Sequence, residues 1–230
     1  SSAASDVYKR QQDMVLGIYY LTQERPGAKG EGMFFKSPNE ALLAYENGAV
    51  TLHARIKVRV TKTLPDGRTM TGIVDTTVGR ILFNEIIPQD LGFVDRTIPG
   101  NELKPEIDFL VKKKQLKQIL EKVINTHGAI QTAITLDDIK AIGYKYSTRA
   151  AMTVSISDMT VPATKKQLLA DAEATVDRIA KNFRRGLITE EERYKEVIDV
   201  WKATDDQLTH DLLTGLDKYN NIFMMADSGA

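Results

Sequence analysis

The sequence predicts an α+β fold, in which mixed short strands and helices are followed by a long antiparallel α-helical hairpin. Three observations support this prediction. Apolar and cationic residues alternate over positions 54–60, which is the two-residue period of a half-buried strand. Positions 168–183 and 194–212 place apolar residues at steps of three and four, the period of an amphipathic helix. Between these helices, residues 184–192 combine a helix stop with a helix start.

The first half of the chain has clear start and stop signals for short elements. Ser37, Pro38 and Glu40 form an N-cap serine, a first-turn proline and a capping-box glutamate, so a helix is expected from here to Asn47-Gly48. The alternating strand over residues 54–60 is followed by a turn at residues 65–67, and residues 69–74 are expected to return as its hairpin partner. Residues 88–105 are rich in Gly, Pro and Asp and are expected to be mostly loop.

Helical periodicity returns after residue 105. One apolar stripe runs from Leu110 to Val123, and a second helix is expected through Ile139, Ile142 and Tyr146. Thr135, followed by acidic residues at positions 137 and 138, predicts the N-terminus of that second helix.

The last third predicts the hairpin. Its first helix follows Pro162, and its stop is expected at Arg184, Arg185 and Gly186, because glycine accepts the left-handed conformation that ends a helix. Thr189 and Glu192 form a capping box that starts the second helix. Each helix is expected to have about 20–25 residues, or roughly 30–38 Å at 1.5 Å per residue. The tip is suited to docking another protein, and the pattern fits plain packing within the chain equally well. The two expected apolar stripes are Leu168, Leu169, Ala172, Val176, Ile179 and Phe183, and Tyr194, Val197, Ile198, Trp201, Leu208 and Leu212.

Composition and motifs indicate no self-contained chemistry. The 230 residues carry 31 basic and 31 acidic side chains and no cysteine, which excludes disulfides, thiolate zinc sites and cysteine nucleophiles. His53, His127 and His210 are far apart and lack metal-ligand spacing, and the glycine-rich segment 27–32 lacks the ending of a phosphate-binding loop. No apolar run approaches the ~18 residues that cross a membrane. No catalytic residue and no metal ligand is predicted.

Both ends of the sequence suggest a piece of a longer protein. The start has no initiator Met and no secretory signal, and residues 1–11 are similar to a translated sequencing adapter or to a disordered tail. The other end stops at Ala230 without a charged tail, which indicates a cut.

Seven short segments, in this order, resemble the bacterial RNA polymerase β′ family over residues 12–230. Each is weak alone, and the ordered set is specific. They are Gln12–Thr22, Ala28–Met33, Leu52–Arg59, Thr76–Arg80, Glu192–Tyr194 with Val197–Trp201, and Met224–Ala230.

The resemblance implies an organisation for the chain. Residues 12–160 would be the pore region, which borders the channel through which nucleotides enter, and residues 161–217 would be the funnel, whose hairpin forms the channel rim. Residues 218–230 would begin a truncated segment leading toward the bridge helix. The family's magnesium-binding aspartates lie before Gln12, so this chain would hold no cofactor and would be inactive alone. The intact enzyme would be a cytoplasmic, nucleoid-associated nucleotidyltransferase. Its partners would be other polymerase subunits, DNA template, RNA, nucleoside triphosphates and transcript-cleavage factors. No membrane association is expected.

Few residue roles follow from the resemblance. Gln12 matches a glutamine close to the incoming nucleotide, and Glu192, Tyr194 and Asp199 match rim positions that bind factors or alarmones in some bacteria. Glu196 stands where those relatives carry Lys, and a carboxylate in place of a cation weakens a phosphate site, so no alarmone binding is expected. The alternative is a stand-alone helical-hairpin interaction module. A start codon near residue 12 and a stop after residue 230 would favour it over the polymerase family.

Overall fold

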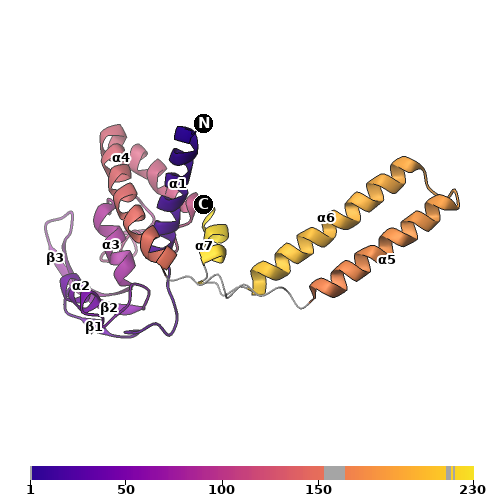
Figure 1. Cartoon of the computed structure of the whole chain (residues 1–230). Helices are drawn as coiled ribbons and strands as arrows, with labels where there is room; N and C mark the ends of the chain where they lie inside the picture. The colour runs from indigo at the N-terminus through magenta and orange to yellow at the C-terminus, as the bar shows by residue number, and fades with distance from the viewer. Residues whose placement is uncertain (1, 153–163, 216–218, 220) are drawn as a thin grey trace. The chain divides into compact units, whose positions relative to one another are not determined.

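The computed structural model describes residues 2–152, 164–215, 219 and 221–230, which fall into two compact units. Unit 1 comprises Ser1–Thr153 and Met224–Ala230, and unit 2 comprises Val154–Phe223. The predicted α+β class is confirmed, because unit 1 combines helices with a small sheet and unit 2 contains a helical hairpin (Figure 1). Pro162 and the predicted boundaries at residues 160 and 217 lie outside the described residues.

The sheet of unit 1 has three strands in the order β1-β2-β3. β1 (Phe34–Phe35) pairs in parallel with β2 (Ile56–Thr63), and β2 pairs antiparallel with β3 (Thr69–Thr76), from Ile56 opposite Thr76 to Thr63 opposite Thr69. The predicted hairpin is confirmed. Ile56 and Val58 are fully buried, whereas Lys57 and Arg59 are exposed. The alternation of apolar and cationic residues in the sequence therefore predicts the buried face of β2 correctly.

Helix α2 (Pro38–Glu46) confirms the expected start and stop. Ser37 Oγ accepts a hydrogen bond from Glu40 N at 3.1 Å. At the other end, Gly48 has φ +78°, Gly48 N donates to Tyr45 O, and Ala49 N donates to Ala44 O, the pair of bonds that closes a glycine-ended helix.

Helix α3 (Val78–Ile86) occupies residues for which the sequence predicted no helix or strand. It begins at Thr77, whose Oγ1 accepts from Arg80 N at 3.1 Å, and Ile87 and Pro88 follow its last turn. The segment from residue 88 to 112 contains no helix or strand, in agreement with the loop predicted over residues 88–105.

Helix α1 (Ser2–Thr22) packs against α4 (Lys113–Met152) through two glycines. A Cβ atom placed on Gly17 would lie 1.7 Å from the carbonyl oxygen of Gly143, so the two backbones approach closely at this crossing. The side chains from Met14 to Thr22 are buried there. α1 extends back to Ser2, with residues 3–11 exposed, so the disordered alternative for residues 1–11 is wrong for the described part of this tail. The similarity to a translated adapter stays a prediction.

Helix α4 corrects the predicted start at Thr135. The helical geometry is interrupted at Gly128, with φ +84° and ψ −176°, seven residues earlier. Thr135 lies inside the helix and is fully buried, so it caps nothing. A glycine with positive φ interrupts a helix, because most other residues resist positive φ. The position of Gly128 therefore determines where the second helix begins, and the polar side chain of Thr135 does not.

Unit 2 contains the predicted antiparallel hairpin of α5 (Lys165–Arg184) and α6 (Glu190–Gly215), which lie side by side (Figure 1). Gly186 ends α5 with φ +73°; Gly186 N donates to Phe183 O and Leu187 N donates to Asn182 O. Thr189 Oγ1 accepts from Glu192 N at 3.2 Å at the start of α6. Both predicted signals are therefore confirmed.

Helix α7 (Asn221–Ser228) brings the chain back to unit 1, where Met224 is fully buried. The core of unit 1 draws on every one of its helices and on the sheet. Its fully buried large side chains are Ile18, Tyr19, Leu21, Ile56, Phe83, Ile107, Ile119, Ile139 and Met224.

Candidate functional site

The tip of the hairpin holds the three predicted factor-docking residues. Glu192, Tyr194 and Asp199 all lie on α6 and are exposed, Tyr194 by 64%. Seven residues make almost two helical turns, so Glu192 and Asp199 share a face. Tyr194 lies on a different face, one turn before Ile198. The structure thus brings two of the three predicted residues onto one surface.

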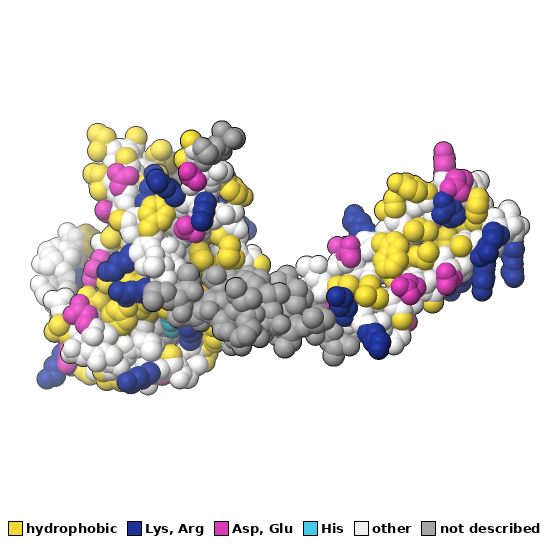
Figure 2. Space-filling model, in the orientation of Figure 1, with side chains coloured by type: hydrophobic (Ala, Val, Ile, Leu, Met, Phe, Trp, Pro, Cys, Tyr) yellow, Lys and Arg dark blue, Asp and Glu magenta, His cyan; other side chains and the backbone are white. Residues whose placement is uncertain are grey.

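Large apolar side chains are exposed around the same tip. Phe183, Leu187, Tyr194 and Ile198 are 37%, 67%, 64% and 44% exposed, and Figure 2 shows hydrophobic side chains on the hairpin among charged ones. The sequence assigned Phe183, Tyr194 and Ile198 to the inner stripes of the hairpin and did not single out Leu187. These assignments are wrong in part, because the half-buried residues of α6 are Arg193, Val197, Val200, Trp201, Thr204, Leu208 and Asp211.

A local charge pair and a cation–π contact lie at the tip. Arg193 Nε donates to Glu190 Oε2 at 3.0 Å, and the Arg193 guanidinium lies 5.4 Å from the centre of the Phe183 ring, which joins the two helices. This pair lowers the pKa of Glu190 through the hydrogen bond from Arg193. Exposed pairs of this kind contribute little to stability. The tip is therefore a surface with accessible apolar area rather than a buried core.

Gln12, the predicted substrate-proximal residue, lies on α1 in unit 1. It is half-buried and lies two residues before the buried segment that starts at Met14. The long packed helix holds its position, although residues 3–11 before it are exposed.

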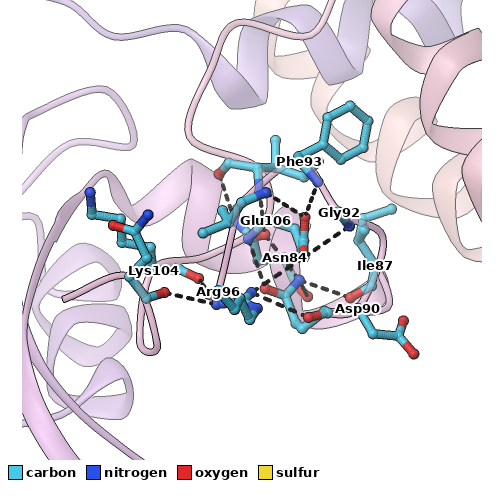
Figure 3. Close-up of polar contacts among 12 residues, drawn as sticks. Asn84, Ile87, Asp90, Gly92, Phe93, Arg96, Lys104 and Glu106 are labelled. Carbon is cyan, nitrogen blue, oxygen red and sulfur yellow. Dashed lines mark hydrogen bonds and ion pairs between the residues drawn. The ribbon is translucent and has the colours of Figure 1, made fainter. Parts of the chain in front are cut away.

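A buried glutamate organises the loop that follows α3 (Figure 3). The Glu106 side chain is 1% exposed and accepts hydrogen bonds from the backbone N–H groups of Gly92, Phe93 and Val94 at 3.4, 2.8 and 3.3 Å. Arg96 NH2 lies 3.4 Å from Glu106 Oε1, and Arg96 NH1 donates to Lys104 O at 2.9 Å. A buried carboxylate with this many donors fixes the loop in one conformation.

Two side-chain amides continue this network. Asn84 Nδ2 donates to Arg80 O and Ile107 O, and Asn84 Oδ1 accepts from Ile107 N at 3.0 Å. Gln89 Oε1 accepts from Glu106 N at 2.9 Å, and Gln89 Nε2 donates to Asn84 Oδ1. Helix α3 and the loop are thus linked through bonds that span up to 23 residues of sequence. No sequence motif identified these residues, since each partner is distant along the chain.

A second buried network surrounds Arg80. Arg80 Nε donates to Thr22 O at 3.0 Å, and Arg80 NH1 lies 3.1 Å from Asp108 Oδ1. Arg55 makes a two-bond contact with the same carboxylate, which raises the pKa of Arg55. Thr22 Oγ1 accepts from Val111 N at 3.0 Å, so the end of α1 is held by α3 and by the segment before α4.

Asp227 on α7 is the centre of a third contact. It accepts from Tyr19 OH at 2.8 Å and from Lys112 Nζ at 2.9 Å. Burial acts to raise the pKa of Asp227, but these two partners bring it below its usual value. Burial and the bond to Asp227 raise the pKa of Tyr19. The contact ties α7 to α1 and to the start of α4.

Of the three histidines, one is buried and two lie at the surface. His53 is buried, and its Nε2 donates to Tyr20 O at 2.7 Å because a carbonyl only accepts. Burial lowers the pKa of His53 to about 3, with a further decrease from Arg25. His127 lies 2.6 Å from Asp90 at the surface, and His210 is exposed on α6.

The described residues bring together no group of three or more His, Asp or Glu side chains able to hold a metal ion. Of the helices that the structure describes, none has the length and apolarity to cross a membrane.

Comparison with known proteins identifies the family. Residues 5–159 match the family model described as RNA polymerase Rpb1, domain 3. The chain therefore belongs to this family.

The particular relatives are bacterial. Over 219 residues, or 95% of the chain, it is 68% identical to the DNA-directed RNA polymerase subunit beta′ of Lachnoclostridium phytofermentans, of which it covers 18%. It is 56% identical over the same length to the beta′ subunits of Clostridium kluyveri and Caldicellulosiruptor saccharolyticus, covering 19% of each. The resemblance to β′ subunits is thus confirmed, and the chain spans about a fifth of the length of these relatives.

Proposed function

We propose that this chain is a part of the β′ subunit of a DNA-directed RNA polymerase. Unit 1 would line the channel through which nucleotides enter, and the α5–α6 hairpin would form the rim on which elongation factors dock. The high identity to β′ subunits supports the polymerase assignment. The exposed apolar side chains at the tip support the docking role, because accessible apolar area surrounded by charge is typical of a protein interface.

In this proposal the chain forms part of the wall of the nucleotide channel and takes no part in the phosphoryl-transfer reaction. The other polymerase subunits, the DNA template, RNA and nucleoside triphosphates would be partners of the whole enzyme. Mg²⁺ held by residues outside the chain would supply the phosphoryl-transfer chemistry. The contributions of this chain would be a channel wall of fixed shape and a docking surface. A cytoplasmic, nucleoid-associated location follows from the same proposal.

The docking role is tested in a bacterial polymerase that carries this segment. Leu187→Ala together with Tyr194→Ala removes exposed apolar contacts, so the affinity for a transcript-cleavage factor should fall roughly tenfold or more, about 1.4 kcal/mol. Basal elongation should be unchanged. Lys202→Ala, an exposed change on α6 away from the tip, is the control. Unchanged factor affinity in the double variant would refute docking at this tip.

The channel role is tested through Gln12. Gln12→Ala removes one neutral hydrogen-bonding side chain, which is worth roughly 0.5–1.5 kcal/mol, so the KM for nucleoside triphosphates should rise roughly three- to tenfold. Gln11→Ala changes the exposed neighbour on the same helix and should leave the KM unchanged. An equal response of both variants would show that Gln12 is not near the nucleotide.

A further inference from the structure

We propose that the outer edge of β3 is a docking site for an extended polypeptide segment, which adds a fourth strand to the sheet of unit 1. β3 is the last strand of the order β1-β2-β3, so only one of its two edges has a partner strand. This inference rests on the proposed function, because the added segment belongs to the same polymerase. It concerns a surface that neither the channel role nor docking at the hairpin tip requires.

The free edge of β3 presents a row of unpaired backbone groups. Leu64 N donates to Arg68 O at 2.7 Å, so the hydrogen-bonded pairs of the β2–β3 ladder are those with even residue numbers. The odd-numbered residues direct their N–H and C=O groups away from the partner strand. On β2 this is observed, since Lys57 N donates to Met33 O beside β1. On β3, the groups that point outward have no hydrogen-bond partner within the described parts of the chain. They belong to Thr69, Thr71, Ile73 and Asp75.

The spacing of these groups identifies the class of partner. Alternate residues of a strand lie about 6.8 Å apart, at about 3.4 Å per residue, and each of them offers one donor and one acceptor. Another polypeptide strand offers the complementary pattern at the same spacing. Addition of such a strand to an exposed sheet edge is a common mode of peptide recognition.

The two edges of the sheet differ in their protection against pairing. β1 has two residues, and so short an edge strand offers little backbone to a partner. β3 has eight residues, pairs with β2 without a bulge, and contains neither proline nor lysine. Asp75 is its only charged residue, and Ile73 is 57% exposed. Because a long edge without these protective features pairs readily with other strands, we expect it to be covered in the assembled protein.

A cavity of about 400 Å³ lies along the same edge. Residues of β3 between positions 70 and 75 line one wall, and residues of the loop between positions 100 and 108 line the other. The lining includes β3 residues from both faces of the sheet and no residue of β2, so the cavity borders the outer edge of β3. The Glu106 network holds the loop in place. The space beside the edge is therefore present before a partner binds.

The charges of this cavity favour a polypeptide over a nucleic acid. The lining includes two basic and two acidic side chains, so its net charge is zero. They are Arg55, Lys104, Asp75 and Asp108. A nucleic-acid strand requires an excess of positive charge to neutralise its phosphates. A balanced lining fits a partner that is recognised through its backbone.

The occupant is an extended segment of the β′ chain outside residues 1–230. This chain spans about a fifth of the length of its beta′ relatives, so a subunit of that length has many further residues that can supply a strand. The segment pairs best with an apolar side chain beside Ile73 and a basic side chain beside Asp75, because such cross-strand pairs stabilise a sheet.

The test is residue-level amide hydrogen exchange, first in the free 230-residue chain and then in a bacterial polymerase that carries this segment. In the free chain, the amides of Thr71, Ile73 and Asp75 should exchange at least about tenfold faster than those of Gly72 and Val74, which donate to β2. In the polymerase, the same three amides should exchange at least about tenfold more slowly than in the free chain, because each then donates to the added strand.

Ile73→Pro tests whether backbone pairing is responsible. It removes one outward N–H and leaves the β2–β3 ladder intact, since proline is tolerated on an edge strand where its nitrogen faces outward. In the polymerase, the amides of Thr71 and Asp75 should then exchange as fast as in the free chain. Ile73→Val keeps the N–H and a β-branched side chain, so it should keep the slow exchange. If Ile73→Pro does not fold, the unchanged chain, free and assembled, still provides the test.

A photo-cross-linking side chain at position 73 identifies the occupant, and the cross-link should form within the β′ subunit. A cross-link to a different subunit would overturn the choice of occupant. Equal edge exchange in the free and assembled chain, or slow exchange that persists in a folded Ile73→Pro variant, would overturn strand addition. Edge protection in the free chain that rises with its concentration would identify a second copy as the occupant and would also overturn the proposal. A segment that gives no active polymerase would instead refute the proposed function, before any exchange is measured.

Discussion

Unit 1 and the hairpin of unit 2 are stabilised in different ways. Unit 1 buries charged and polar side chains, including Arg80 and Glu106, and satisfies them with partners far away in sequence. Among the described residues of the hairpin, only Ala172 and Ile179 are buried, and the capping and ion-pair contacts at its tip join near neighbours. This difference indicates that contacts between residues near in sequence are enough to define the hairpin. The fold of unit 1 requires contacts between residues that are far apart in sequence.

Unfolding of the hairpin can be distinguished from unfolding of unit 1 with a single fluorophore. Trp201, the one tryptophan of the sequence, lies half-buried on α6, so tryptophan fluorescence reports unfolding of the hairpin. Far-ultraviolet circular dichroism reports both regions. Comparing the two signals shows which region a substitution affects.

The largest expected effect is that of Glu106→Ala. It leaves three backbone N–H groups and Arg96 without their acceptor, and losing one partner of a buried charge network costs roughly 3–5 kcal/mol. Urea unfolding followed by circular dichroism should show this loss for unit 1, with little change in the Trp201 signal. Glu121→Ala, an exposed change on α4, should be nearly neutral. Equal losses in both signals would mean that the two regions unfold together.

Gly17→Ala should be nearly as severe. The added Cβ would meet a backbone carbonyl rather than a movable side chain, so α1 and α4 must separate, and overpacking costs of about 3 kcal/mol are expected. Gly27→Ala adds a Cβ with no atom within 4 Å and serves as a comparison, although its positive φ carries a backbone cost of its own. The measurement is the urea midpoint of the circular dichroism transition. If Gly17→Ala were tolerated, the helices would not be in close contact.

Acid should weaken unit 1 more than the hairpin. The pKa of His53 is about 3 in the folded chain, below its unfolded value of 6.5. As the pH falls below 6.5, the unfolded chain gains a proton that the folded chain does not, so stability is lost until about pH 3. The loss is about 1.4 kcal/mol per pH unit, or roughly 2 kcal/mol at pH 5.

His53→Gln tests this linkage, because glutamine can still donate to Tyr20 O but does not titrate near neutral pH. The variant should be less stable at pH 7 and should show a shallower decline between pH 7 and 5. The same slope in His53→Gln as in the parent chain would assign the acid sensitivity to other groups.

The smallest effect is expected for the hairpin cap. Thr189→Ala removes the acceptor of Glu192 N at the start of α6, which costs about 1 kcal/mol. The Trp201 transition should shift while the remaining circular dichroism change stays the same. Thr189→Ser keeps the cap and should restore the midpoint. A shift of the unit 1 transition instead would contradict the inference that the stability of the hairpin depends on contacts between residues near in sequence.

The same contrast explains how much could be predicted from sequence. The hairpin, its stop at Gly186 and its cap at Thr189 were predicted because periodicity and capping act over a few residues. The β2–β3 hairpin was predicted for the same reason. The start at Thr135 was wrong because Gly128 breaks the helix earlier, and tertiary packing buries Thr135.

The interior of unit 1 could not be predicted by such rules. Glu106 has no local motif, and its partners become apparent only when the loop folds around it. The rim residues Glu192 and Asp199 came from a family resemblance rather than from periodicity, and their roles remain predictions. The exposure of Phe183 and Ile198 was missed because a helical stripe does not reveal how much of its width a single partner helix covers.

The contact of Tyr19 and Lys112 with Asp227 has a consequence for how this chain can change over evolutionary time. Residues on both sides of the hairpin belong to unit 1, so residues 154–223 form an insertion whose two ends return to the same folded body. Insertions of this kind are tolerated when the host keeps its own core. We therefore expect that the hairpin can be lengthened, shortened or replaced without loss of the unit 1 fold, because α7 keeps its contacts with Tyr19 and Lys112.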